Sequence, residues 1–242
     1  EFFFILSGFV LYPQLAKVYT NKKNLNIFFL RRWFRTIPLY ILALICYSIL
    51  FNKFDLDTLK YLLFIQKFTN TFLEYDYFSV AWSLSVEEIF YVTFPIFLII
   101  LNRQKFLNII IIFLSIIYFL KFSYIFKGSI DNEFFRVGTF LRLDAIAFGL
   151  IIRKYYSEST NIYFNLLIGI LICFFINSLE SLSELNKYEI FIFILVIQIF
   201  SINILSIFLW INKFINTRFL KRIFSLLSKQ TYSVYLFHLF PV

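Results

Sequence analysis

The 242-residue sequence has few of the residues that punctuate or cross-link a chain: five glycines, four prolines and two cysteines. Because no Pro/Gly/Ser-rich linker, low-complexity tract or internal repeat interrupts it, we predict a single domain over residues 1–242. Cys46 and Cys173 lie far apart, each in an apolar stretch without a neighbouring histidine or cysteine. This placement argues against a disulfide and against a metal site, and we expect no permanently bound cofactor.

Hydrophobic residues make up 61% of the chain, and the mean hydropathy is +0.81. Since several apolar runs can cross a hydrocarbon core of about 30 Å, we predict an all-α, polytopic transmembrane bundle of about eight spans or part-spans. They are expected near residues 37–51, 80–101, 106–124, 139–153, 161–177, 188–211 and 230–242, with residues 1–12 as the second part of a further helix. A weakly amphipathic stretch, Leu56 to Ile65, is expected on the membrane surface.

Acidic residues are scarce, 14 against 23 lysines and arginines, which gives a net charge of +9. Four predicted loops, residues 13–35, 102–105, 153–160 and 212–229, hold 15 of the 23 basic residues and a single acid, Glu158. By the positive-inside rule these loops are cytoplasmic. The basic surplus then reflects topology, so we expect the lipid bilayer and no nucleic acid as a partner.

A few ionisable residues remain at membrane depth once the loops are set aside. In the stretch FSVAWSLSVEEIFYVTFP, Ser83, Glu87 and Tyr91 share one helical face through their i,i+4 spacing, whereas Glu88 points roughly 100° away. An ionised carboxylate in the bilayer needs a partner or a wet cavity. Glu87 is therefore interpreted either as the lining of a polar cavity or as a structural glutamate that joins two helices through an arginine.

Arg142 and Asp144 lie two residues apart in FLRLDAIAFG, so they point in nearly opposite directions on a helix and need partners on other helices. We predict that Arg142 pairs with Glu87 or Glu88. His238, the only histidine, lies in YSVYLFHLFP. It is either a hydrogen-bonded core residue or a base, because its ordinary pKa is close to neutrality.

Three arginines, Arg31, Arg32 and Arg35, precede a predicted span in LRRWFRTIP. On a helix their i,i+3 and i,i+4 spacing presents one cationic face, which suits the bidentate recognition of phosphates. The alternative is a positive clamp at the membrane surface that meets only phospholipid headgroups.

Together these segments resemble the membrane O-acyltransferases of acyltransferase family 3. The resemblance rests on EFFFILSGFVL (residues 1–11), LRRWFRTIPLY (30–40), WSLSVEEIFYVTFP (82–95), RLDAIAFG (142–149) and YSVYLFHLFP (232–241), which occur in the order expected for the family. It implies transfer of an acyl group, commonly acetyl, from cytoplasmic acyl-CoA to a hydroxyl of a carbohydrate or glycolipid, and with it we expect a bacterial plasma membrane.

The resemblance also implies roles for individual residues. The arginines Arg31, Arg32 and Arg35 would bind the CoA phosphates, and Trp82, Ser83 and Tyr91 would contact substrate. The catalytic group would comprise Glu87, Arg142, Asp144 and His238.

The family's catalytic histidine belongs to an earlier helix, which would precede Glu1. We therefore expect the chain as given to be truncated at both ends and inactive. The rival interpretation is a transporter or flippase in which Glu87, Arg142 and Asp144 bind a substrate or relay protons at mid-membrane.

Overall fold

Long apolar helices form most of the computed structural model, which describes residues 1–68, 76–127, 134, 137–155, 165, 167–172, 187–212 and 232–237. Its helices are α1 (Phe2–Thr20), α2 (Asn24–Leu50), α3 (Leu56–Leu62), α4 (Ala81–Ile100), α5 (Phe106–Lys127), α7 (Leu143–Tyr155) and α9 (Lys187–Asn212), with a 3-10 turn η1 (Thr139–Arg142) before α7. The described residues contain no strand. The five helices α1, α2, α4, α5 and α9 are long and apolar enough to cross a membrane, so the predicted all-α polytopic class is confirmed.

The first two helices are longer than the sequence indicated. Helix α1 continues through Pro13 to Thr20, and only Asn21–Lys23 separate it from α2. The prediction of a basic loop over residues 13–35 is therefore wrong. Hydropathy marks where a chain leaves the lipid, whereas polar residues such as lysine, glutamine and arginine are good helix formers and let a helix continue into water.

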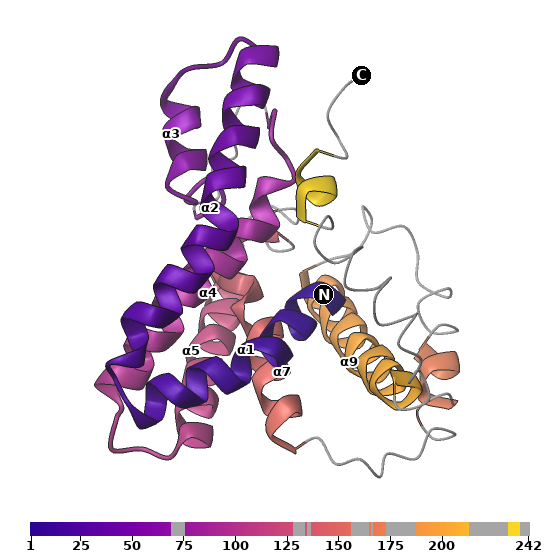
Figure 1. Cartoon of the computed structure of the whole chain (residues 1–242). Helices are drawn as coiled ribbons and strands as arrows, with labels where there is room; N and C mark the ends of the chain where they lie inside the picture. The colour runs from indigo at the N-terminus through magenta and orange to yellow at the C-terminus, as the bar shows by residue number, and fades with distance from the viewer. Residues whose placement is uncertain are drawn as a thin grey trace.

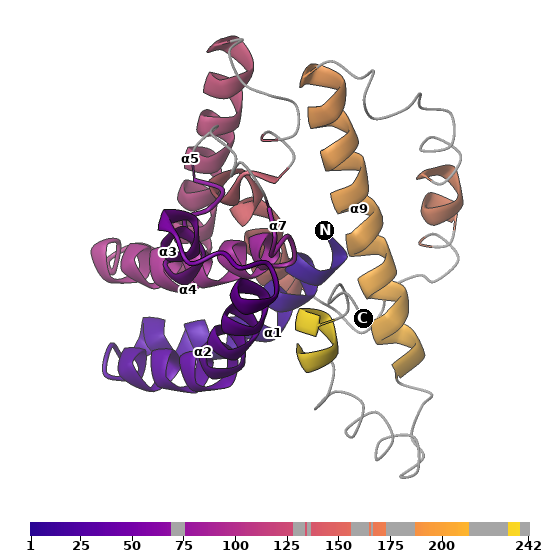
Figure 2. The ribbon, with the colours of Figure 1, turned by 90° about the horizontal axis from the view of Figure 1, so that it is seen from above.

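Helix α7 lies at the centre of the bundle and packs against α1, α4, α5 and α9. Seen from above, α2 and α4 lie on one side of α7 and α9 on the other (Figure 2). With 13 residues, α7 is about 20 Å long, too short to cross a bilayer core. The span predicted at residues 139–153 is thus a short, buried helix, and the spans predicted at 161–177 and 230–242 lie largely outside the described residues.

The link between α4 and α5 lies at the same end of the bundle as the link between α1 and α2. Tyr19, near the end of α1, donates a hydrogen bond of 3.0 Å from its hydroxyl to the carbonyl oxygen of Gln104. Figure 1 shows both links at the lower left. Two of the four basic segments therefore share one end of the molecule, as the charge pattern requires; that this end is cytoplasmic stays a prediction.

Helices α1 and α7 cross with their backbones in contact at two glycines. A methyl group on Gly8 would overlap the carbonyl oxygen of Ile146, and one on Gly149 would overlap the carbonyl oxygen of Ile5. Small residues at such crossings allow membrane helices to pack by close van der Waals contact. This crossing fixes α1, which forms one wall of the site described below.

We expect Gly149→Ala to lower the free energy of unfolding by about 1–3 kcal/mol, because the obstructing atoms belong to the backbone and cannot rotate away. A thermal melt in detergent measures the change. Gly169→Ala is the matched control, since the new methyl group would meet only the end of the Asn203 side chain, at 3.3 Å. Equal melting temperatures for Gly149→Ala and the unmodified protein would contradict the close crossing.

Candidate functional site

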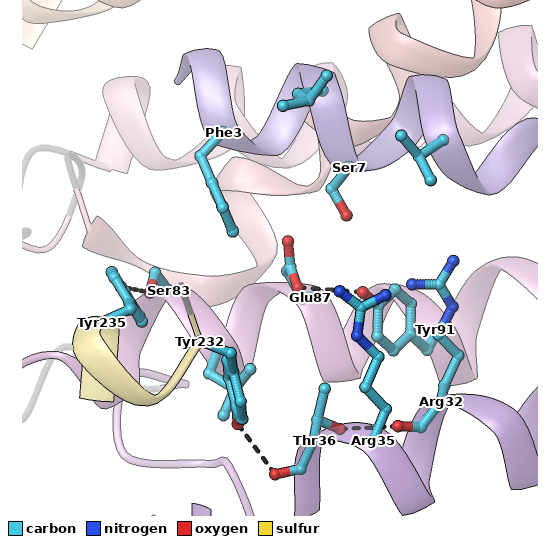
Figure 3. Close-up of a pocket in the computed structure, with 13 residues that line it drawn as sticks. Phe3, Ser7, Arg32, Arg35, Thr36, Ser83, Glu87, Tyr91, Tyr232 and Tyr235 are labelled. Atoms are coloured by element: carbon cyan, nitrogen blue, oxygen red, sulfur yellow. Dashed lines mark hydrogen bonds between the residues drawn. The ribbon is translucent and has the colours of Figure 1, made fainter. Parts of the chain in front are cut away.

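A cavity of about 400 Å³ lies between α1, α2, α4 and the helical turn at residues 232–237 (Figure 3). Its apolar wall comes mainly from α1 and its polar groups mainly from the other three elements. The lining residues are Phe3, Leu6, Ser7, Val10, Arg32, Arg35, Thr36, Ser83, Leu84, Glu87, Tyr91, Tyr232 and Tyr235. Only helices distant in sequence can enclose this space, so the cavity is a product of the tertiary fold.

Glu87 contributes a carboxylate to this cavity. Its side chain is buried, at 7% exposure, and its Oε2 accepts a hydrogen bond of 3.0 Å from the Tyr91 hydroxyl. The Ser7 hydroxyl of α1 faces the same carboxylate from across the cavity (Figure 3). Among the described residues, Oε1 has no hydrogen-bond partner. Ser83, Glu87 and Tyr91 all line the cavity, which confirms that their shared face is a cavity wall.

Glu88 points away from the cavity, as helical geometry predicts for the neighbouring residue. It accepts a hydrogen bond of 2.8 Å from the Thr36 hydroxyl and is buried between α2 and α4. Of two adjacent carboxylates, only Glu87 faces the enclosed space. Glu88 therefore joins two helices, which makes it a useful comparison residue.

Two of the three clustered arginines reach the cavity. Arg32 donates from Nε to Gln14 Oε1 at 3.3 Å, and its guanidinium lies 5.4 Å from the centre of the Tyr91 ring. Arg35 is exposed and lines the cavity, and no carboxylate among the described residues lies within ion-pair distance of it. Arg31 is exposed and is not a lining residue. The i,i+3 pair Arg32 and Arg35, rather than all three arginines, forms the cationic wall.

The turn at residues 232–237 closes one end of the cavity with two tyrosines that sequence reasoning did not select. The Tyr232 hydroxyl donates to the carbonyl oxygen of Thr36 at 2.9 Å, and the hydroxyls of Tyr235 and Ser83 are hydrogen-bonded. The sequence offered one signal for these tyrosines, because they lie in the same short segment as His238. His238 itself lies outside the described residues, so its role stays a prediction.

Trp82 does not line the cavity. Its ring packs edge-on against Phe4, with centroids 5.7 Å apart. Trp82 therefore makes a packing contact between α4 and α1, and its expected contact with substrate stays a prediction. Neighbouring helical residues diverge by roughly 100°, so Trp82 cannot share the direction of Ser83.

Arg142 forms an ion pair with Glu1, so the predicted pairing of Arg142 with Glu87 or Glu88 is wrong. The side chain leaves η1, at the start of α7, toward the start of α1. A local sequence pattern could not indicate this, because the partner depends on how α1 crosses α7. Neither Arg142 nor Asp144 lines the cavity.

Asp144 forms a second buried ion pair, with Lys121 of α5. The Nζ and Oδ2 atoms are 2.5 Å apart, and the side chains are 1% and 0% exposed. Gln198 of α9 donates to the same oxygen at 3.0 Å. That Arg142 and Asp144 need partners on other helices is confirmed. The sequence analysis did not select Lys121, although its position within the predicted span 106–124 was a usable signal.

Comparison with known proteins identifies the family of this chain. The acyltransferase domain model of acyltransferase family 3 matches residues 1–242, and the chain belongs to this family. One relative is the "Putative peptidoglycan O-acetyltransferase YrhL" of Bacillus subtilis (strain 168), 29% identical over 119 residues, which are 41% of this chain and 19% of the relative.

A second relative, a "Putative O-acetyltransferase" of Staphylococcus aureus (strain COL), is 28% identical over 172 residues, or 62% of this chain and 28% of the relative. In these matches the chain spans 19% to 28% of the relatives' length. No solved structure matches the chain significantly.

Proposed function

We propose that the protein transfers an acyl group, acetyl in the first instance, from acyl-CoA to a hydroxyl of a carbohydrate or cell-surface glycan. The observation that carries this proposal is the cavity in which the buried carboxylate of Glu87 and the arginines Arg32 and Arg35 meet. Family membership and the O-acetyltransferase names of the relatives support the same type of reaction.

Arg32 and Arg35 are the proposed contacts for the phosphates of CoA. A guanidinium group offers a planar set of donors that matches a phosphate bidentately. Arg32 is held in place by Gln14 and by the Tyr91 ring, whereas Arg35 has no acidic partner among the described residues. An anionic donor would therefore meet one prepositioned cation and one whose charge is not already neutralised by a neighbouring acid.

Glu87 is the proposed proton acceptor. In the transfer, the acceptor hydroxyl attacks the thioester carbonyl carbon, a carbon–oxygen bond forms, the carbon–sulfur bond breaks, and CoA leaves as its thiol after receiving a proton. The attacking hydroxyl must lose its proton, which requires a base within hydrogen-bond reach. Glu87 Oε1 has no hydrogen-bond partner among the described residues, so it is available to accept that proton.

The proposed acceptor is a hydroxyl of an envelope glycan. The name of the Bacillus subtilis relative specifies peptidoglycan, and we extend that chemistry to this chain as part of the proposal. Acyl-CoA is cytoplasmic and would enter from the end that holds the basic α1–α2 and α4–α5 links. The glycan hydroxyls would therefore have to approach from the opposite end of the bundle. The cavity between those ends supports a reaction in which the two substrates meet within the bundle.

Arg35→Ala should weaken the binding of acetyl-CoA about ten- to a hundred-fold, because a hydrogen bond to a charged group contributes about 1.5–3 kcal/mol. Isothermal titration of the protein in lipid nanodiscs with acetyl-CoA provides the dissociation constant. Arg35 is a better target than Arg32, whose contacts with Gln14 and Tyr91 also support the fold.

Arg31→Ala is the matched control, because it removes the same charge from the same helix outside the cavity. It should change the dissociation constant less than threefold. If the two variants bind equally well, the arginines act only as a clamp on lipid headgroups and the donor site is wrong.

A further inference from the structure

Helix α3 runs back along the last turns of α2 instead of lying across the end of the bundle (Figure 1). Near the start of α3, the Thr58 hydroxyl is hydrogen-bonded at 2.9 Å to the Tyr77 hydroxyl, which also lies 3.4 Å from Ser48 of α2. At its far end, the carbonyl oxygen of Tyr61 accepts a hydrogen bond of 2.8 Å from the hydroxyl of Tyr40.

These contacts show how far the chain after α2 runs back along that helix. Tyr40 lies ten residues before Leu50, the last residue of α2, and ten helical residues rise about 15 Å. The ring of Phe64, just after α3, stacks on the Tyr40 ring with centroids 4.6 Å apart. The chain after α2 therefore turns back and descends along it by about half the thickness of a bilayer core.

The outward face of α3 is apolar. Leu56, Leu59 and Leu63 are 76%, 52% and 61% exposed, while Tyr61 on the opposite face is fully buried. The adjoining part of α2 exposes residues of the same kind, Leu42, Ile45 and Ile49. The two helices thus share one continuous apolar surface, and α2 belongs to the helices able to cross a membrane.

The charged groups of α3 are Asp57 in its first turn and Lys60 in its last turn. Asp55 caps the start of the helix. The Lys60 side chain points back toward that start, and its Nζ lies 2.6 Å from Asp57 Oδ1. A lysine that directs its ammonium group toward the membrane surface while its stem stays in apolar surroundings is typical of a helix that enters lipid.

Two polar residues that follow the last turn of α3, Gln66 and Lys67, are buried and have partners inside the protein. Gln66 donates to the Ser85 hydroxyl at 2.6 Å, and Lys67 lies 3.1 Å from Asp76. The carbonyl oxygen of Lys67 accepts from the Thr139 backbone amide at 3.2 Å. Non-helical backbone at membrane depth is tolerated where protein satisfies it in this way.

We infer that α3 is a re-entrant helix whose face of Leu56, Leu59 and Leu63 contacts the hydrocarbon chains of the lipid bilayer. The occupant of this surface is lipid, because the face continues the apolar surface of α2 and because the helix axis follows that of α2. This inference differs from the expectation that the stretch from Leu56 to Ile65 lies on the membrane surface.

Spin labels attached to single cysteines test the inference. Leu56→Cys, Leu59→Cys and Leu63→Cys are made in a background where Cys46 and Cys173 are serine, and each labelled protein is reconstituted in phosphatidylcholine vesicles. The ratio of collision rates with oxygen and with a water-soluble nickel chelate reports depth. It should rise steadily from Leu56 to Leu63, corresponding to a depth difference of about 10 Å for seven helical residues.

Ile45→Cys on α2 provides the hydrocarbon reference and Lys22→Cys in the link before α2 provides the water reference. The elution volume of each variant on size-exclusion chromatography checks its fold. Equal ratios at the three α3 positions would show a helix lying flat in the interface. Ratios equal to that of Lys22→Cys would show exposure to water, and low collision rates with both reagents would show a protein partner; each of these results overturns the inference.

Discussion

Glu87→Gln should lower the rate of acetyl transfer from acetyl-CoA to envelope glycan by about a hundred-fold or more. Glutamine keeps the shape of the side chain and its contact with Tyr91, but it cannot accept a proton, and general base catalysis contributes about 10²–10⁴-fold. The acetyl-CoA dissociation constant should change by less than threefold, because Arg32 and Arg35 remain. Radiolabelled acetyl incorporation in membranes that contain the protein with its native flanking sequence, together with titration, separates the two effects.

Glu88→Gln is the matched control. It alters the adjacent carboxylate of the same helix, which bonds to Thr36 and does not face the cavity. Its transfer rate should stay within tenfold of the unmodified protein. An active Glu87→Gln protein would identify Glu87 as a structural residue, and an equal loss in both variants would indicate a disturbed α4 instead of a missing base.

Lys121→Met should lower the free energy of unfolding by about 3–5 kcal/mol, because it leaves Asp144 charged and without its cation in the interior. Both side chains are essentially inaccessible, so water cannot compensate. The double variant Lys121→Met/Asp144→Leu should regain most of the loss, since a buried ion pair replaced by apolar residues is often neutral. Thermal melts in detergent provide the comparison.

Lys60→Met is the control for this prediction. It breaks the Lys60–Asp57 pair on α3, whose lysine side chain is 48% exposed, and an exposed pair contributes about 0–1 kcal/mol. Similar melting temperatures for Lys121→Met and Lys60→Met would contradict the assignment of a buried pair between α5 and α7. A double variant less stable than Lys121→Met would show that Asp144 is stabilised mainly by Gln198.

The sequence predicted correctly the features that depend on residues close together in the chain. Ser83, Glu87 and Tyr91 line one wall because i,i+4 spacing aligns them on any helix. The span predicted at residues 80–101 matches α4, which begins at Ala81 and ends at Ile100. Hydropathy alone was sufficient there, because the apolar run and the helix have the same ends.

Predictions failed where the answer depended on contacts between helices. The loop predicted over residues 13–35 is helical, because hydropathy reports the edge of the lipid and not the end of a helix. The partner of Arg142 is Glu1, brought close by the crossing of α1 and α7 at Gly8 and Gly149. Lys121 was not selected, and its pairing with Asp144 depends on the packing of α5 against α7.

The sequence by itself determined the all-α membrane class of the protein, the spans at residues 80–101, 106–124 and 188–211, and the need of Arg142 and Asp144 for partners on other helices, because these follow from hydropathy and helical periodicity. The tertiary structure alone decided which acid meets which base, that Glu87 and not Glu88 faces the cavity, and that Tyr232 and Tyr235 close it. Those outcomes depend on the angles and offsets at which helices cross, and such geometry arises from close packing between segments far apart in the chain.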